Sequence, residues 1–452
     1  MILTRLKNIV ESQGDTIDNV VITVPAYFGL EERSATKQAG ELAGLNVLNL
    51  INEPTAAALS YCARQFQEDR TILVYDLGGG TFDVTIINMS MTEGGGVQKI
   101  TVLATGGDDR LGGKDWDDRL FDYILNACCE ENGLTKEEID SETRQDIRSK
   151  VEEAKRKLSQ KEKTKVRIDV NGSRTEIVIT RNDFERMTAD IVGRTMNFVD
   201  KTLGDVKKNY DINDTDIDTV LLVGGSTYMP MIKEAVEARF PGKVQQHDPD
   251  QAVAKGAAIY ASMIGLDVEN AAGGEGNLNE NGEVDDSKRA ELAAKFTVED
   301  QTPRSFGPGV VDTKGNKNKY ILENFIKIGE KMPAIATKTY YPIEDNQERV
   351  RLRAFENMSM DDSLIPCVNE DGEPQATDPA HGVKLLGELI VNLPPNTPKT
   401  APIQVTFKVD ASGVHVEAIN TTTGDKFETF LRTASDIDIE KSAVHQLRIS
   451  SD

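Results

Sequence analysis

The chain has 452 residues, enough for two or three domains, and its apolar fraction of 38% is enough to build real cores. Its 52 basic and 75 acidic residues give a net charge of −23, which argues against nucleic acid or an anionic membrane as a main partner. The four cysteines and four histidines match no disulfide or zinc pattern, and no apolar run could span a membrane. We therefore expect a cytoplasmic protein with reduced thiols.

Residues 1–265 alternate strand and helix patterns. We expect strands at 20–24, 71–76, 82–88, 99–105, 165–170, 175–180 and 218–223. Helical patterns cover 31–43, 54–62, 115–132, 136–159 and 181–208. The mixture of hairpins and crossover helices predicts an α/β domain with two sheets.

The pattern changes twice after this region. Residues 266–297 place acids among Gly and Asn, which predicts a flexible acidic linker or insertion. Residues 298–434 contain short alternating strands, such as 403–409, separated by turns. They predict an antiparallel β-domain with one buried face, and residues 435–452 form a tail.

The most informative segment runs from Asp76 to Asp83 and reads Asp-Leu-Gly-Gly-Gly-Thr-Phe-Asp. Glycines bring bare N–H groups close to a ligand, and a nest of such groups suits phosphate oxygens. A carboxylate at the end of a buried strand suits a hydrated magnesium ion. A Gly-rich hairpin turn is the better interpretation of the glycines alone, but the two acids and Thr81 at this spacing favour a nucleotide.

Residues 150–160 predict an amphipathic helix whose apolar face is Val151, Ala154 and Leu158. Four polar residues share another face, at i, i+3, i+4 and i+7: Glu152, Lys155, Arg156 and Ser159. In isolation, an ordinary solvated face with i,i+4 pairs is clearly the better explanation of this pattern. The functional alternative is a polar face that grips a base and a ribose.

Two further segments have open interpretations. Gly224-Gly225 follows a strand, and Ser226 or Thr227 can cap the next helix while free N–H groups form a polar cradle. A simple capped loop explains the same residues. Glu53 precedes a helix, where it is either a favourable acid at the helix N-terminus or a carboxylate aimed at metal-bound water.

Together these segments resemble the heat-shock protein 70 (DnaK-type) chaperone family in order and spacing. The motifs that carry the resemblance are Val24–Phe28, Asn52–Ala58, Tyr75–Asp83, Leu111–Gly113, Glu152–Ser159, Val223–Pro230 and Pro249–Ala254. The match is specific over 1–265. It continues more weakly over 298–434, through Asp345–Gln347, Leu385–Gly387, Leu393–Pro395 and Ile403–Gly413.

The resemblance implies an α/β actin-like (ribonuclease H-like) ATPase domain at 1–265, N-terminally truncated, followed by a β-sandwich peptide-binding domain at 298–434. It implies ATP or ADP with Mg²⁺, and K⁺ as a further ion. Catalysis would involve Thr81, with Glu53 and Asp76 on the waters of Mg²⁺ and Asp83 beside K⁺ or the attacking water. The nucleotide would be bound by Gly78, Gly79, Gly80, Thr81, Glu152, Lys155, Arg156, Ser159, Gly224, Gly225, Ser226, Tyr228 and Asp250.

The resemblance also implies a peptide site and an allosteric relay. Extended peptide would bind at Val311, Tyr340, Ile343, Val350 and Leu352, although each of these residues also fits an ordinary core. Pro25 and Arg33 match the positions that relay the nucleotide state to the interdomain linker.

Several features depart from the family pattern. The family's first phosphate loop and its catalytic lysine, which precede the region matched here, do not appear in this sequence, and neither does the helical lid. We therefore expect impaired hydrolysis and exposed sheet edges and apolar faces. Tyr228 replaces an arginine that stacks on adenine, and it can still stack without the charge. The linker Phe296–Asp300 lacks most of the usual leucines, and an extra stretch lies near 358–382.

We therefore expect an ATP-dependent molecular chaperone that binds unfolded apolar peptide segments under nucleotide control. Its expected partners are extended client peptides, a J-domain co-chaperone and a nucleotide exchange factor. The alternative is a peptide-binding holdase or scaffold with little or no ATP hydrolysis. A sugar kinase or actin-like filament protein would share the nucleotide fold, but the β-domain disfavours both.

Overall fold

The computed structural model describes residues 1–14, 16–17, 19–26, 28–62, 68–91, 97–246, 248–272, 297–312, 319–357, 365–366, 377–378, 382–410 and 413–431. It divides into two compact units, one of Met1–Leu50 with Glu299–Asp452 and one of Ile51–Val298. Of the predicted acidic linker 266–297, residues 273–296 lie outside the described residues, as does the tail, whereas residues 266–272 belong to the helix Ala252–Ala272 instead of a flexible segment. The four-part division at residues 265, 297 and 434 stays a prediction.

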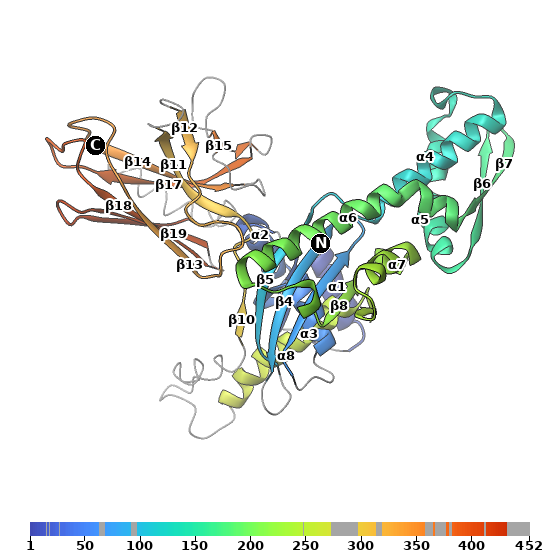
Figure 1. The fold of residues 1–452 in the computed structure, drawn as a ribbon, viewed down its shortest axis with the longest axis horizontal. Helices are drawn as coiled ribbons and strands as arrows, with labels where there is room; N and C mark the ends of the chain where they lie inside the picture. The colour runs from blue at the N-terminus through green and yellow to red at the C-terminus, as the bar shows by residue number, and fades with distance from the viewer. Residues whose placement is uncertain are drawn as a thin grey trace. The chain divides into compact units, whose positions relative to one another are not determined.

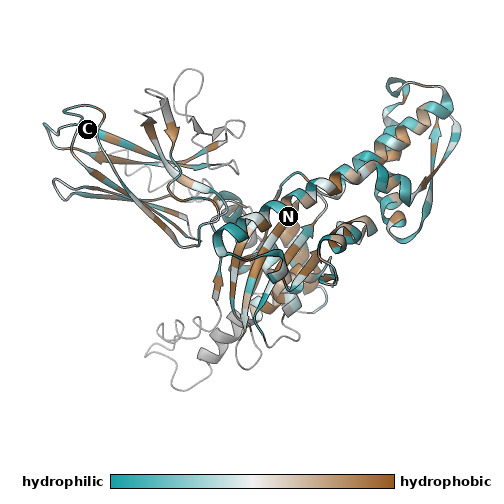
Figure 2. Cartoon of the chain, viewed as in Figure 1, coloured by the Kyte–Doolittle hydropathy of each residue, from teal (hydrophilic) through white to brown (hydrophobic). Residues whose placement is uncertain are grey.

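A six-stranded mixed sheet forms the centre of the Ile51–Val298 unit (Figure 1). Its strand order is β10 (Thr297–Glu299), β5 (Val97–Asp108), β4 (Phe82–Met91), β3 (Arg70–Leu77), β8 (Thr219–Val223) and β9 (Val244–Gln246). β4 pairs antiparallel with both β3 and β5, whereas β8 is parallel to β3 and β9. The central strands are hydrophobic along most of their length (Figure 2), as expected for a sheet covered on both faces.

Helices cover the two faces of this sheet. Leu73 and Tyr75 pack in one core with α6 (Arg181–Tyr210), and the Tyr75 hydroxyl lies 2.7 Å from Thr195 Oγ1. On the other face α3 (Glu53–Cys62) packs against α8 (Ala252–Ala272), so closely that a Cβ on Gly256 would lie 1.7 Å from the Ala56 carbonyl oxygen. Because side chains alternate along a strand, Asp76 points to the face opposite Tyr75, towards α3.

The N-terminal end of α6 packs with a smaller subdomain (Figure 1). This subdomain consists of α4 (Gly113–Asn132), α5 (Ser141–Gln160) and the hairpin of β6 (Lys163–Val170) and β7 (Ser173–Thr180). The predicted hairpin is confirmed, with positive φ at Asn171 and Gly172. The helix predicted over 136–159 is present, but it starts later than predicted. A short 3₁₀ turn, η1 (Lys136–Glu138), comes first, and α5 starts after Asp140, whose side chain accepts a hydrogen bond from the Thr143 N–H.

The strands after residue 300 form an antiparallel β-sandwich, in agreement with the predicted class. One sheet has the order β15 (Ile365–Pro366), β12 (Lys319–Leu322), β11 (Ser305–Asp312), β14 (Arg349–Asn357), β17 (Val383–Asn392) and β16 (Thr377–Asp378). The other has the order β13 (Ala334–Tyr340), β18 (Ile403–Asp410), β19 (Gly413–Asn420) and β20 (Lys426–Leu431). Alternating residues of both sheets, such as Leu389 and Phe407, share one buried cluster.

The first fifty residues belong to the same unit as the sandwich. They form α1 (Ile2–Glu11), α2 (Leu30–Leu42) and a separate sheet of β1 (Asn19–Val24) and β2 (Asn46–Asn52). The α/β part therefore contains three sheets, not the expected two, because β1–β2 and β6–β7 each pair apart from the main sheet. No residue of α1 is buried, and Ile2, Leu6 and Ile9 are exposed.

Candidate functional site

A cavity of about 560 Å³ in the Ile51–Val298 unit collects polar residues from four distant segments. Its lining is Gly79, Glu152, Lys155, Arg156, Ser159, Gln160, Gly225, Ser226, Tyr228, Met229 and Asp250. All of these except Gln160 and Met229 are residues that the sequence assigned to nucleotide binding. The fold thus brings together residues that lie more than a hundred positions apart in the sequence, such as Gly79 and Asp250.

The glycine segment is the tight turn between β3 and β4. The Gly78 N–H donates to the Thr81 carbonyl at 3.0 Å, which closes the turn. Gly79 and Gly80 are exposed, and a Cβ on either would meet nothing within 4 Å. The backbone at the tip of this turn is therefore open to a ligand.

The first turn of α4 packs directly against this glycine turn. The Gly113 N–H donates to the Gly78 carbonyl at 3.0 Å, and the Lys114 N–H donates to the Gly79 carbonyl at 2.8 Å. A Cβ on Gly112 would lie 2.5 Å from the Gly80 nitrogen, so only glycine allows this approach. The resemblance singled out Gly112 and Gly113, but their packing role depends on a contact that the sequence does not show.

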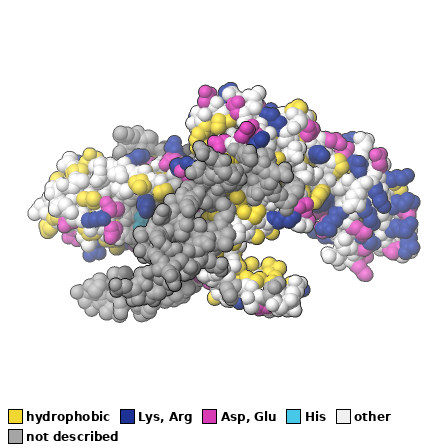
Figure 3. All heavy atoms as spheres, turned by 90° about the horizontal axis from the view of Figure 1, so that it is seen from below, with side chains coloured by type: hydrophobic (Ala, Val, Ile, Leu, Met, Phe, Trp, Pro, Cys, Tyr) yellow, Lys and Arg dark blue, Asp and Glu magenta, His cyan; other side chains and the backbone are white. Residues whose placement is uncertain are grey.

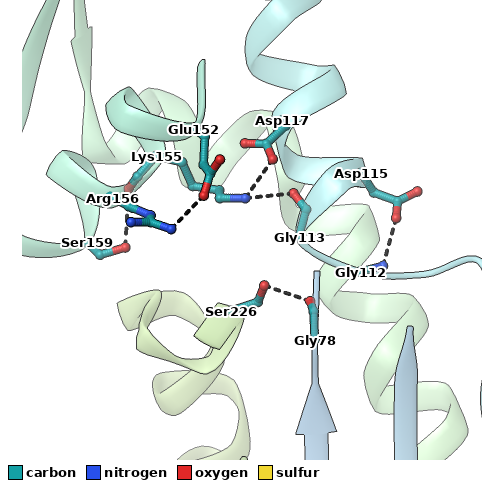
Figure 4. Close-up of polar contacts among 10 residues, drawn as sticks. All are labelled: Gly78, Gly112, Gly113, Asp115, Asp117, Glu152, Lys155, Arg156, Ser159 and Ser226. Carbon is teal, nitrogen blue, oxygen red and sulfur yellow. Dashed lines mark hydrogen bonds and ion pairs between the residues drawn. The ribbon is translucent and has the colours of Figure 1, made fainter. Parts of the chain in front are cut away.

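The polar face of α5 points into the cavity and carries two ion pairs (Figure 4). Lys155 Nζ donates to Asp117 Oδ2 at 2.8 Å and to the Gly113 carbonyl at 3.0 Å. Arg156 donates to Glu152 at 2.7 Å, with both side chains largely exposed. Asp117 was missed by the sequence reasoning; its signal was an acid one helical turn after Gly113.

Gly224 and Ser226 fix the opposite wall of the cavity. Gly224 has φ +86°, and a Cβ there would lie 2.3 Å from the Leu77 carbonyl oxygen. The Ser226 hydroxyl donates to the Gly78 carbonyl at 2.8 Å (Figure 4), and the Thr227 hydroxyl donates to the Gly224 carbonyl. The prediction that Ser226 or Thr227 caps a helix was wrong, because η3 (Gly225–Tyr228) intervenes and α7 (Pro230–Arg239) starts at Pro230 without a side-chain cap.

Tyr228 lies at the rim of the cavity, with about half of its surface exposed. Its hydroxyl lies 3.1 Å from Asp250 Oδ1, to which it donates a hydrogen bond. This bond restricts the ring, whose face remains partly exposed for stacking.

Three acids lie on the α3 side of the main sheet. Asp76 and Asp83 are direct partners across β3 and β4, and both are buried. Burial and the charge of Glu53 raise the pKa of Asp76 to about 7, and burial with the charges of Asp76 and Glu53 raises the pKa of Asp83 well above its usual range. Burial also raises the pKa of Glu53. A cation that neutralises these carboxylates would relieve their mutual repulsion and so stabilise the folded chain.

The acids fit a hydrated cation better than a directly ligated one. Asp83 Oδ1 is buried without a hydrogen-bond partner among the described residues. No three acid, histidine or cysteine side chains in the described part of the chain lie close enough to hold one metal ion together. A magnesium ion keeps several waters, and carboxylates that bind those waters need not converge on the metal itself.

A second cavity of about 570 Å³, between α5 and β6, has a different character. Its basic residues are Lys150, Lys157, Lys161, Lys163, Lys165 and Arg167. Figure 3 shows Lys and Arg side chains gathered at this end of the unit. Four of these residues form ion pairs with three acids, since Lys150 pairs with Asp146, Lys157 with Glu153, and both Lys165 and Arg167 with Glu176.

The predicted peptide-site residues occupy different environments in the sandwich. Leu352 is buried in the core, and Tyr340 and Val350 pack partly against it from opposite sheets. Val311 is half-buried at the end of β11, whereas Ile343 is 69% exposed beyond the end of β13. Tyr340 also stacks on Phe325, with ring centroids 5.7 Å apart.

The predicted relay residues lie close together. The Pro25 carbonyl accepts from the Phe28 N–H, and Arg33 Nε donates to the Phe28 carbonyl at 3.0 Å. Burial lowers the pKa of Arg33, while the charge of Asp300 acts in the opposite direction. Arg33 therefore interacts electrostatically with the segment that the sequence assigned to the linker.

Several sequence expectations concern other parts of the chain. Cys128 and Cys129 are free thiols buried in α4, as expected for helix packing. The side chains of Cys62 and Cys367 lie outside the described residues, as do three histidines, whereas His415 packs against Phe430. Among the described residues, no helix is both long and apolar enough to cross a membrane.

Comparison with known proteins identifies the family. Residues 1–273 match the Hsp70 protein family, so the chain belongs to the Hsp70 (DnaK-type) chaperone family. Curated relatives include the chaperone protein DnaK of Halobacterium salinarum strains R1 and NRC-1, each 35% identical over 427 residues. These alignments cover 92% of this chain and 58% of each relative, so the chain spans less than two thirds of the proteins that it matches.

Proposed function

We propose that the chain is an ATP-binding chaperone that holds extended apolar peptide in its β-sandwich and releases it under nucleotide control. The observation that carries the proposal is the single cavity that joins Gly79, the polar face of α5, and the η3 wall with Asp250. Backbone N–H groups, paired cations and a partly exposed tyrosine ring provide the groups that a nucleoside phosphate needs.

Adenosine would lie between α5 and η3. Lys155, Arg156 and Ser159 would contact the ribose and base from one side, and Tyr228 would stack from the other, with Asp250 orienting its hydroxyl. Binding would have to rearrange the Arg156–Glu152 pair, which is inexpensive because both side chains are largely exposed. Gly224 and Gly225 would bring the backbone close to the nucleotide.

The phosphates would lie over Gly78–Thr81, where the turn leaves its tip open. Asp76 and Glu53 would hold waters of a magnesium ion, which supplies charge neutralisation when bound. Asp83, with its unpartnered oxygen, would orient a water for in-line attack or neighbour a potassium ion. Hydrolysis, peptide release, a J-domain co-chaperone and an exchange factor are parts of the proposal carried over from the family.

Peptide would bind at the sandwich near Val350, Tyr340 and Val311, with the exposed Ile343 available as a covering side chain. An extended peptide gains affinity from backbone hydrogen bonds and specificity from one apolar pocket. Arg33, facing Asp300, would connect the nucleotide state to the linker.

A holdase without hydrolysis is the second candidate. The observation that favours it is that Lys155 and Arg156 are already neutralised by Asp117 and Glu152. In that case nucleotide would change peptide affinity little.

The test is the affinity for a fluorescent Leu-rich peptide, measured by anisotropy without nucleotide, with Mg-ADP and with Mg-ATP. We expect affinity to fall at least about fivefold in Mg-ATP relative to Mg-ADP, mostly through the off-rate. Equal affinities in all three conditions would support the holdase. Absence of peptide binding would refute both candidates.

A further inference from the structure

We propose that Lys114 binds the terminal phosphate of a nucleoside triphosphate and so distinguishes it from the diphosphate. This inference rests on the proposed nucleotide site and assigns a role to a residue that the sequence motifs left without one. Three features of Lys114 support this role: its position, its lack of a partner and its unfavourable place in the helix.

The position of Lys114 is fixed by the backbone. Its N–H donates to the Gly79 carbonyl at 2.8 Å, so it adjoins the turn proposed to hold phosphates. The preceding Gly112 touches the same turn, since a Cβ there would lie 2.6 Å from Gly80 Cα (Figure 4 shows Gly112 and Gly113 beside Gly78). Side chains of a helix lean towards its N-terminus, so the Lys114 stem leans towards the glycine turn.

Lys114 is also an uncompensated charge. Its side chain is exposed, and no ion pair or side-chain hydrogen bond joins it to another described residue. The cations nearby are engaged, because Lys155 pairs with Asp117 and Arg110 lies 3.6 Å from Asp109. Among the described residues that border Gly79, Lys114 is therefore the cation that remains available to bind an anion.

Its place in the helix is unfavourable for stability. Lys114 is the second residue of α4, where the helix macrodipole favours acids and disfavours a cation. The next residue, Asp115, is the acid that this position favours, and its carboxylate accepts a hydrogen bond from the Gly112 N–H at 2.8 Å. A cation that opposes the dipole and has no partner is better explained by a ligand than by folding.

The chemistry selects the triphosphate. The terminal phosphate of ATP carries most of the additional negative charge relative to ADP, and an ammonium on a flexible stem suits a phosphate oxygen. Glu53, Asp76 and Asp83 lie on one side of the sheet, and their carboxylates would repel the terminal phosphate. A cation at the glycine turn, together with magnesium, would counter that repulsion.

The experiment compares wild type with Lys114→Met, Lys114→Arg and the control Lys208→Met, a similarly exposed lysine in the last turn of α6. Each is titrated by calorimetry with Mg-ADP and with Mg-AMP-PNP, a triphosphate analogue that resists hydrolysis. Lys114→Met should weaken AMP-PNP binding about tenfold and ADP binding less than about twofold, corresponding to one lost charge contact. Lys114→Arg should restore binding, and Lys208→Met should match wild type.

Thermal unfolding separates binding from folding. Lys114→Met should leave the midpoint unchanged or raise it slightly, because an unfavourable helix charge is removed. Equal weakening for both nucleotides, or none for either, would overturn the assignment while leaving the nucleotide site intact. Absence of binding by wild type would overturn the nucleotide site and Lys114 with it.

Discussion

Asp76 and Asp83 face each other across the antiparallel pair of β3 and β4, with 8% and 2% of their surfaces exposed. Two buried carboxylates in direct register repel each other, and Glu53 adds to the repulsion. This arrangement costs stability unless a cation is bound. The pair is therefore better explained by ligand binding than by folding.

The pair predicts opposite effects of Asp76→Asn on stability and on binding. Without metal, the variant should have a higher thermal midpoint than wild type because one buried charge is removed. Its affinity for Mg-nucleotide should fall by at least about tenfold, because a carboxylate for the hydrated ion is lost. The exposed control Asp118→Asn should change neither quantity, and unchanged Mg-dependent binding by Asp76→Asn would remove Asp76 from the site.

Tyr228 offers a test of stacking without charge. Tyr228→Phe keeps the ring and loses the bond to Asp250, so we expect less than about threefold weaker ADP binding. Tyr228→Ala removes the ring and should weaken binding about tenfold, in line with the loss of one base stack. Calorimetry with ADP and with ribose 5-phosphate separates these roles, since the second ligand has no base and should be insensitive to either change.

Val350 tests the peptide pocket. Val350 is opposite Val391 in the β14–β17 pair and half-buried against the sandwich core. Val350→Phe should fill the proposed pocket and weaken binding of a Leu-rich peptide at least about fivefold, with the domain still folded. Ile390→Phe is the matched control, because Ile390 is opposite Arg351 on the other face of the same pair and is exposed. If Val350→Phe held the affinity of wild type, the pocket would lie elsewhere.

Glu356 predicts a pH dependence of stability. Its carboxylate is buried in β14, close to Gly29, and no hydrogen bond of good geometry reaches either oxygen. Burial and the charge of Glu32 raise its pKa to about 7, against the smaller effects of the Arg304 guanidinium and the Leu30 N–H. At a pH between the unfolded and the folded pKa, the native state therefore keeps a proton on Glu356 that the unfolded chain has released.

Stability should consequently fall as the pH rises from the unfolded pKa of about 4.5 to the folded value of about 7. The loss attributable to Glu356 is up to about 3 kcal/mol in the free energy of unfolding. Glu356→Gln should remove this part of the pH dependence, as measured by urea unfolding at pH 5 and pH 8. The exposed control Glu344→Gln should keep the wild-type difference, and an equal difference in all three proteins would mean that Glu356 is ionised or solvated throughout.

Local patterns were sufficient for much of the fold. Alternating and continuous apolar runs located β3, β8 and the β18–β19 pair, and Asn171-Gly172 located a hairpin. The helix boundary near Asp140 was missed because the η1 segment keeps a helical composition and breaks only where Asp140 caps α5. Composition alone does not distinguish a continued helix from a restarted one.

The site residues were predictable as types but not as contacts. The polar face of α5 and the glycine turn are visible in the sequence, whereas Asp117 and Ser226 acquire their roles through partners 38 and 148 residues away. Gly112 shows the same limit, since its need for glycine comes from the backbone of Gly80. These long-range contacts are set by packing, which a single sequence does not display.

The most direct test of the account is a calorimetric titration of the intact chain with ADP, performed with Mg²⁺ and again with EDTA. We predict saturable binding at one site per chain, with affinity that falls without Mg²⁺ and falls further in Asp76→Asn. Absence of binding in either condition would contradict the assignment of the cavity between α5 and η3 to a nucleotide. Peptide binding by the sandwich would then be the function left to this chain.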